Sequence, residues 1–99
     1  MSVVSLDHFF STLSSPRRVK ILQFLGKNGA TNVSEISASL TIEQSAVSHS
    51  LIKLLDCHFV DVARDGKERI YSLNTETIQP LLQQIENHVE KYCVESCDH

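Results

Sequence analysis

A mainly α-helical fold that carries one β-hairpin is predicted by three features of this 99-residue sequence. Between Ile36 and Val60, two short helical patterns flank a polar break at Thr41, as in a helix-turn-helix. Directly downstream, apolar and polar residues alternate on both sides of Asp65 and Gly66, a dipeptide typical of tight hairpin turns. Apolar residues at helical spacing precede and follow these two motifs. Together these features predict a winged helix-turn-helix.

The two helices expected before the motif follow from spacing and caps. A first helix near residues 5–13 places four apolar side chains on one face: Leu6, Phe9, Phe10 and Leu13. A second helix has Ser15 as its cap and Pro16 at its first position, where a missing N–H costs nothing. Gly26 or Gly29 is expected to end it.

The helix-turn-helix itself consists of helices at about 33–40 and 43–56. The second of them has an apolar stripe at helical spacing, formed by Val47, Leu51, Leu54 and Leu55. Its other face is polar and suits a recognition helix that reads base edges and grips phosphates, with Gln44, Ser45, Ser48, His49 and Lys53. An ordinary amphipathic surface helix is the alternative interpretation.

The hairpin, FVDVARDGKERIYSLN, is interpreted as a wing. Arg64, Lys67 and Arg69 crowd its tip, where they would reach the minor groove or the flanking phosphates. A solvated hairpin tip is the alternative for these charges alone. The combination of a helix-turn-helix with a basic hairpin directly after it indicates DNA binding more specifically than either motif does alone.

The last helix is expected to begin near Thr77 and to hold Pro80 in its first turn. Its apolar stripe contains Ile78, Leu81, Leu82, Ile85, Val89 and Tyr92. Leaving six such side chains exposed would forfeit about 10 kcal/mol, comparable to the stability of a whole domain. The stripe therefore predicts a homodimer through the first and last helices.

Length and charge bound the remaining possibilities. Residues 1–99 are expected to form one DNA-binding domain with a C-terminal dimerisation helix and a cysteine-containing tail. The net charge of −3 is uneven, since residues 1–69 hold eight Lys/Arg against seven Asp/Glu (+1) and residues 70–99 hold one against five (−4). The acidic part thus lies away from the predicted DNA face. Without a membrane-length apolar run or a leader pattern, we expect a soluble, cytoplasmic protein with no membrane partner.

With these motifs, the chain resembles the ArsR/SmtB family of small winged-helix repressors over nearly its whole length. LSSPRRVKILQFL resembles the family's opening core helix, QSAVSHSL the start of its recognition helix, and RDGKERIYSL its wing. The resemblance implies a homodimer that binds inverted-repeat operators in double-stranded DNA and releases them when a metal ion or another stress signal binds. Family members often have glycine where this chain has Thr41 and His58, so both turns must form without the most permissive residue.

The signal that releases the protein from DNA could act on three cysteines, Cys57, Cys93 and Cys97. In a cytosolic protein a structural disulfide is not expected, which leaves metal binding, thiol chemistry or no role. Cys57 and Cys93 also suit apolar packing, whereas Cys97 has no packing reason to stand in an acidic tail. On a continuing helix Cys93 and Cys97 would point the same way, so that pair suits chelation.

The family resemblance excludes two metal sites and favours a third. The family's thiolate site on the third helix would fall on Asn32 and Ser34, neither of which can supply a thiolate. The family's site on the last helix would fall on Thr75, Thr77, Asn87 and Glu90, and the single carboxylate of this set cannot hold zinc. Members similar to the cadmium/lead sensors use a recognition-helix cysteine, matched by Cys57, and tail cysteines, although their companion helix cysteine is Lys53 here. We therefore predict a site of Cys57, Cys93, Cys97 and His99 for a thiophilic ion, namely cadmium, lead, zinc, copper(I) or trivalent arsenic.

Two other functions stay open on the sequence. A redox- or persulfide-responsive repressor would join two of its thiols covalently. Family members of this type carry a cysteine in the second helix, where this chain has Gln23. The reactive pair would therefore be Cys93 and Cys97. A winged-helix protein-interaction module would suit the acidic balance but not the polar face at Gln44 and His49. No phosphate-binding glycine loop or catalytic arrangement is present, so an enzyme is not expected.

Overall fold

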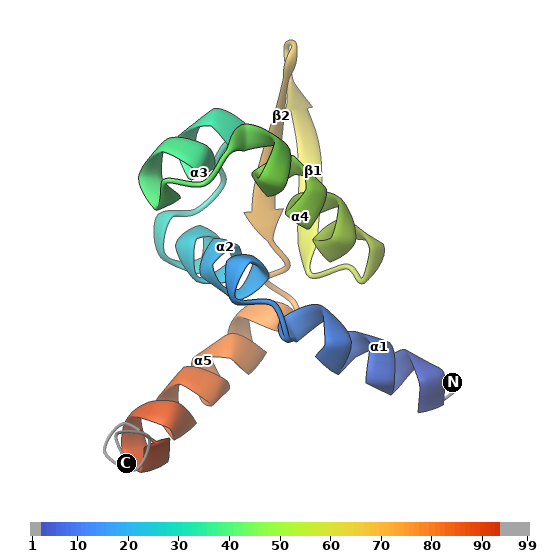
Figure 1. Cartoon of the computed structure of the whole chain (residues 1–99), viewed down its shortest axis with the longest axis vertical. Coiled ribbons are helices and arrows are strands. Elements are labelled where there is room, and N and C mark those ends of the chain that lie inside the picture. Colours follow the sequence, from blue (N-terminus) through green and yellow to red (C-terminus); the bar gives the residue numbers. More distant parts are fainter. Residues whose placement is uncertain (1–2, 94–99) are drawn as a thin grey trace.

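The computed structural model describes residues 3–93, which form five α-helices, one antiparallel hairpin and a terminal π-helical turn. The helices are α1 (Val3–Leu13), α2 (Pro16–Asn28), α3 (Val33–Leu40), α4 (Gln44–Asp56) and α5 (Ile78–His88). The hairpin consists of β1 (Val60–Asp65) and β2 (Glu68–Leu73), and η1 (Val89–Cys93) follows α5. Figure 1 shows α2, α3, α4 and the hairpin gathered in one body, from which α1 and α5 extend away from the hairpin tip. The predicted fold class, mainly α with a β-hairpin wing, is confirmed.

The junction between α1 and α2 is closed by Ser15 and Arg18. As predicted, Ser15 caps α2, with its Oγ accepting from the Arg18 backbone N at 3.4 Å. The Arg18 Nε donates to the Thr12 carbonyl oxygen at 2.7 Å, which binds the end of α1. Gly29, with φ of +81°, follows the last residue of α2, and Gly26 lies inside the helix. Of the two expected stops, Gly29 is therefore the real one.

An apolar core joins α2, α3 and α4 to the base of the hairpin. Its buried side chains are Ile21, Leu22, Leu25, Ile36, Val47, Leu51, Leu54, Phe59, Val60, Tyr71, Leu73 and Ile78. The predicted stripe of α4 is confirmed, with Leu55 half-buried at its edge. Phe59 follows α4 directly, and its ring centroid lies 4.9 Å from that of Phe9, which draws α1 onto the core.

Both turns that lack glycine adopt the left-handed conformation. Thr41 ends α3 with φ of +57° and ψ of +50°, and His58 follows α4 with φ of +60°. The turn at Thr41 is closed by a hydrogen bond from the Ile42 N to the Ser37 carbonyl oxygen at 3.1 Å, as in a Schellman motif. Left-handed backbone costs a residue with a Cβ about 1–2 kcal/mol. A β-branched threonine is among the residues least suited to it.

Replacing Thr41 by glycine is therefore expected to stabilise the protein. Removal of the left-handed strain outweighs the extra unfolded-state entropy of glycine and leaves a gain of about 0.5–1 kcal/mol. Thermal unfolding at fixed protein concentration would show it as a rise of several degrees in Tm, on the order of 4 °C. The matched control is Ala38→Gly within α3, which should lower stability by about 1 kcal/mol. Equal losses in the two variants would refute the strain at Thr41.

The hairpin is a regular wing anchored at its base. Register pairs Val60 with Leu73 and, at the tip, Asp65 with Glu68, so the two turn residues are Gly66 and Lys67 rather than the expected Asp65 and Gly66. The positive φ of +68° falls on Gly66 alone, the pattern of a type II′ turn. At the other end, Thr31 bridges to Tyr71 through Thr31 N to Tyr71 O at 2.9 Å and Tyr71 N to Thr31 O at 2.8 Å. The loop before α3 thus holds the wing to the body.

The apolar faces of α1 and α5 are only partly covered. On α5, Ile78 is buried and Leu82 packs against the core, so the expectation that all six stripe residues need a partner is corrected to four. The side chains that stay exposed are Leu81, Ile85, Val89 and Tyr92, and on α1 Leu6 and Phe10. We call these six residues the apolar surface. Exposed apolar side chains gathered on two helices mark an interaction surface.

Candidate nucleic-acid interface

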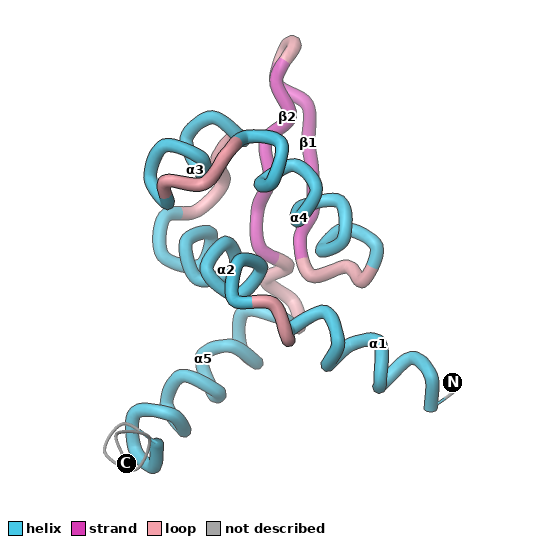
Figure 2. The backbone as a smooth tube through the Cα atoms, viewed as in Figure 1, coloured by secondary structure: helices cyan, strands magenta, loops and turns pink. Residues whose placement is uncertain are grey.

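The outer face of α4 presents the polar residues that the sequence predicted. Gln44, Ser45 and His49 are exposed, and Ser48 is half-buried. The Gln44 Nε2 donates to the Ser34 Oγ at 3.3 Å, which links the start of α4 to α3. Figure 2 shows the short loop that joins the two helices across the turn. Because the apolar stripe of α4 faces the core, this polar face is the one left free to enter a groove of DNA.

The wing carries its three cations in the open. Arg64, Lys67 and Arg69 are all exposed, and Arg64 lies opposite Arg69 in the hairpin register. Like charges placed opposite one another are unfavourable, so a polyanion would relieve their repulsion. Among the residues that the structure describes, none of the three forms an ion pair. The nearby carboxylate of Glu68 instead accepts from the Asn32 Nδ2 at 3.1 Å.

An open groove of about 300 Å³ connects the recognition helix with the wing. Ser48 and Ile52 line it from α4, and Lys67 and Arg69 line it from the wing. The structure therefore brings one of the predicted helix residues next to two of the predicted wing residues. Arg64 is not part of the lining. Glu68 lies between the two cations on the same rim, so the rim carries two basic side chains and one acidic one, and its net positive charge suits a nucleic-acid backbone.

Cys57 lies where α4 meets α1. The residue follows α4, is half-buried, and its Sγ lies 3.3 Å from the Thr12 Oγ1. The Thr12 hydroxyl also donates to the His8 carbonyl oxygen at 2.9 Å. The contact between Cys57 and Thr12 therefore joins the end of the recognition helix to the first helix.

The other predicted metal ligands are not tested by this structure. Cys97 and His99 lie outside the described residues, and for Cys93 only the backbone at the end of η1 is described. Among the side chains that the structure describes, which exclude that of Cys93, no group of three or more His, Cys, Asp or Glu is arranged to hold a metal ion. His88 lies beside Tyr92, with ring centroids 5.0 Å apart.

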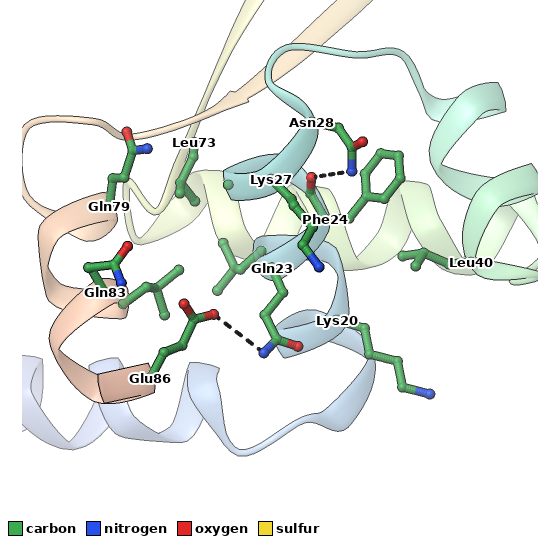
Figure 3. Close-up of a pocket in the computed structure, with 13 residues that line it drawn as sticks. Lys20, Gln23, Phe24, Lys27, Asn28, Leu40, Leu73, Gln79, Gln83 and Glu86 are labelled. Atoms are coloured by element: carbon green, nitrogen blue, oxygen red, sulfur yellow. Dashed lines mark hydrogen bonds between the residues drawn. The ribbon is translucent and has the colours of Figure 1, made fainter. Parts of the chain in front are cut away.

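Asn32, from an excluded metal site, and Gln23, from the position compared with redox sensors, both have structural roles. Asn32 caps α3, with its Oδ1 accepting from the Glu35 N at 2.8 Å. Figure 3 shows Gln23 of α2 pointing across a groove toward Glu86 of α5, to which its Nε2 donates at 3.5 Å. That groove measures about 550 Å³. The position where redox-responsive relatives were expected to have a thiol therefore forms an amide–carboxylate contact between two helices.

Three structurally important residues were missed by the sequence reasoning. Thr12 is buried against Cys57, Arg18 closes α1, and Asn74 links the end of α4 to the start of α5. Asn74 had a detectable signal, because an asparagine between a strand and a helix is a common cap. The contact of Thr12 with Cys57 spans 45 residues of chain and left no such signal.

Comparison with known proteins identifies the family. The sequence profile described as "Bacterial regulatory protein, arsR family" matches residues 15–62. A transcriptional repressor SmtB homolog from Synechocystis is 30% identical over 95 residues, covering 90% of this chain and 71% of the relative. A probable mercury resistance operon repressor from Streptomyces lividans is 36% identical over 74 residues, covering 75% of this chain and 58% of the relative.

Solved structures agree with this assignment. The crystal structure of the transcriptional repressor PagR of Bacillus anthracis superposes with a TM-score of 0.71 at 30% identity, covering 85% of this chain and 99% of PagR. Among the helices that the structure describes, none combines the length and apolar character needed to cross a bilayer. The sequence match, the winged helix-turn-helix and the relatives lead to one conclusion: the chain belongs to the ArsR/SmtB family of bacterial transcriptional regulators.

Proposed function

We propose that this protein is a homodimeric repressor that binds an inverted-repeat operator through α4 and the wing, and that it leaves the DNA when a thiophilic metal ion binds Cys57 and the tail thiols. The observation that carries the DNA-binding part is the exposed polar face of α4 beside the unpaired cations of the wing. The relatives named above are repressors, which supports a regulatory rather than an enzymatic role. Because bacterial operator DNA lies in the cytoplasm, we propose that the protein acts there.

The apolar surface of α1 and α5 supports the dimer. Covering its side chains with the same surface of a second copy would gain about 1.5–3 kcal/mol for each one that becomes fully buried. A two-fold axis through this surface would present two copies of α4 to the same face of DNA. Recognition helices in such dimers lie about 34 Å apart, one turn of the double helix.

The position of Cys57 supports a thiol-based signal. Its Sγ stands at the contact between α1 of the dimer surface and the end of α4. With Cys93, Cys97 and His99 of the tail it would supply soft ligands suited to cadmium, lead, zinc, copper(I) or trivalent arsenic. Two relatives carry names that refer to SmtB and to mercury resistance, which is consistent with a metal as inducer.

Metal binding at Cys57 would change the contact between α1 and α4. A thiolate has no proton to donate and can only accept, so when the sulfur becomes a ligand the Thr12 hydroxyl must either turn its proton from the His8 carbonyl oxygen to the sulfur or lose the contact. The ion must favour the DNA-free state for release to follow. Moving a population from 1:99 to 99:1 takes a preference of about 5.5 kcal/mol between the two states.

Cadmium is expected to release the reduced wild-type protein from its own promoter DNA. One equivalent per subunit should weaken binding by about 5- to 150-fold, the usual range of allosteric coupling, as measured by fluorescence anisotropy. Cys57→Ser should bind DNA as the wild type does and ignore cadmium. The serine hydroxyl can still donate to Thr12 Oγ1, so this variant removes the thiolate ligand while it keeps the contact with α1.

Other responses would separate the alternatives. Release of Cys57→Ser by cadmium would remove Cys57 from the site. Release by mild oxidation or persulfide, without any effect of cadmium, would assign the tail cysteines to a redox pair and refute the metal site. Failure of the reduced protein to bind any promoter DNA would favour a protein-interaction module.

A further inference from the structure

Asn74 joins the end of the recognition helix to the start of α5 through its side chain. The Nδ2 donates to the His58 carbonyl oxygen at 2.8 Å. The Oδ1 accepts from the backbone N of Glu76 at 2.9 Å and of Thr77 at 3.2 Å. One end of the amide therefore binds the left-handed turn that follows α4, and the other end binds the backbone that leads into α5.

The backbone of Asn74 repeats the same link. Its N donates to the Phe59 carbonyl oxygen at 2.9 Å, and its carbonyl oxygen accepts from the Gln79 N at 2.9 Å. Thr77, the residue before α5, makes no side-chain cap bond. The Oδ1 of Asn74 instead fixes the turn just before the helix, so the side chain and the backbone of this residue both link the end of α4 to the start of α5.

Besides the Asn74 link, the described residues supply a few contacts between α5 and the body. Ile78 is buried and Leu82 packs on the core near the start of the helix, and Gln23 reaches Glu86 at 3.5 Å. Figure 1 shows that α5 starts at the base of the hairpin and extends away from the body. A small change of angle at the Asn74 link would therefore move the far end of the helix by a larger distance.

We propose that Asn74 is a positioning residue for operator recognition: its tie between the His58 carbonyl and the turn that leads into α5 sets the angle between α4 and the dimer helix. In a dimer formed through α1 and α5, that angle determines how far apart the two copies of α4 stand. Asn74 thus selects the half-site spacing that the protein accepts, without touching DNA. The inference rests on the proposed homodimeric DNA-binding function.

The Asn74→Asp variant separates this role from helix capping. Aspartate keeps oxygen acceptors for the Glu76 and Thr77 N–H groups and is itself a good cap, but it has no proton for the His58 carbonyl oxygen. The matched control is Asn87→Asp, the same change at an exposed position of α5. Asn87 accepts from Gln83 Nε2 at 3.4 Å, a role that aspartate retains.

The first readout is the spacing preference on DNA. Binding is measured by anisotropy on the inverted repeat of the protein's own promoter, on versions with one base pair added to or removed from the spacer, and on a single half-site. For Asn74→Asp we expect the preference for the native spacing to fall at least about 5-fold, with half-site affinity changed less than about 2-fold. Asn87→Asp should match the wild type on all four DNAs.

A second readout does not require DNA. With Ser45→Cys spin-labelled in a background whose three native cysteines are serine, the distance between the two labels of a dimer reports the separation of the α4 helices. Asn74→Asp should shift or broaden this distance distribution, and Asn87→Asp should not. Unchanged spacing preference and unchanged distances, together with a lower Tm, would reduce Asn74 to a cap and overturn the proposal.

The two readouts also separate this proposal from the function on which it rests. If the wild type shows no preference for any inverted repeat, the proposed function fails. The label distances then decide alone whether Asn74 sets the geometry of the dimer. A changed distribution in Asn74→Asp upholds the positioning role, and an unchanged one ends it.

Discussion

An Ile85→Asp variant is expected to be monomeric and to lose at least about 100-fold in operator affinity. The α4 helix of a monomer binds one half-site without the high effective concentration that the second subunit of a dimer provides. Ile85 belongs to the apolar surface and is 39% exposed in the isolated chain. A carboxylate there would be buried without a partner in the dimer, at a cost of several kcal/mol. Sedimentation equilibrium measures the assembly, and anisotropy measures the affinity for operator DNA.

The control for this variant is Asn87→Asp, which adds the same charge to another side of α5. It should remain dimeric and bind DNA normally. Because Ile85 lies outside the buried core, circular dichroism of the monomeric variant should still show the helical fold. A dimer that persists in Ile85→Asp, or a monomer that binds the operator as tightly as the wild type, would exclude this surface as the source of paired DNA recognition.

The double variant Gln44→Ala and His49→Ala is expected to lose sequence discrimination and keep general affinity for DNA. Each side chain that pairs with a base edge contributes about 1–3 kcal/mol of discrimination, so the loss of both should cost about 2–6 kcal/mol of discrimination per recognition helix. Both residues are exposed and alanine favours helices, so α4 itself should persist. Competition of operator DNA against unrelated DNA of equal length measures the difference.

The contrasting variant is Lys67→Ala with Arg69→Ala in the wing. It should weaken binding to both DNAs alike and reduce the dependence of log K on log salt by about 1 for each phosphate that the wing no longer neutralises. If instead the wing variant alone lost discrimination and the α4 variant lost only general affinity, the roles assigned to the two elements would be reversed.

Most of the backbone was predictable from local patterns, and the error at the last helix has a clear cause. Helical spacing placed α4 and its buried stripe correctly because Val47, Leu51 and Leu54 repeat with the period of the helix. The same spacing marked Ile78 and Leu82 as parts of an exposed stripe, yet both pack on the protein's own core. Periodicity identifies the apolar face of a helix, and it does not tell which part of that face is covered by the same chain.

The candidate site divides in the same way. The exposed residues of α4 and the wing follow from local sequence, whereas their contacts with bases and phosphates stay predictions. The pairing of Cys57 with Thr12 brings together residues 45 positions apart, a distance over which a single sequence carries no pattern. The tail residues Cys97 and His99 lie outside the described residues.

The bridge between Thr31 and Tyr71 bears on the thermodynamics of DNA binding. An isolated two-stranded hairpin is marginally stable in water, but here a paired backbone contact and the buried side chain of Tyr71 order the strands in advance. The backbone of the wing therefore has little freedom left to lose when DNA arrives. The conformational entropy lost in the wing is confined to the long side chains of Arg64, Lys67 and Arg69, so the recognition surface is preorganised for its polyanionic partner.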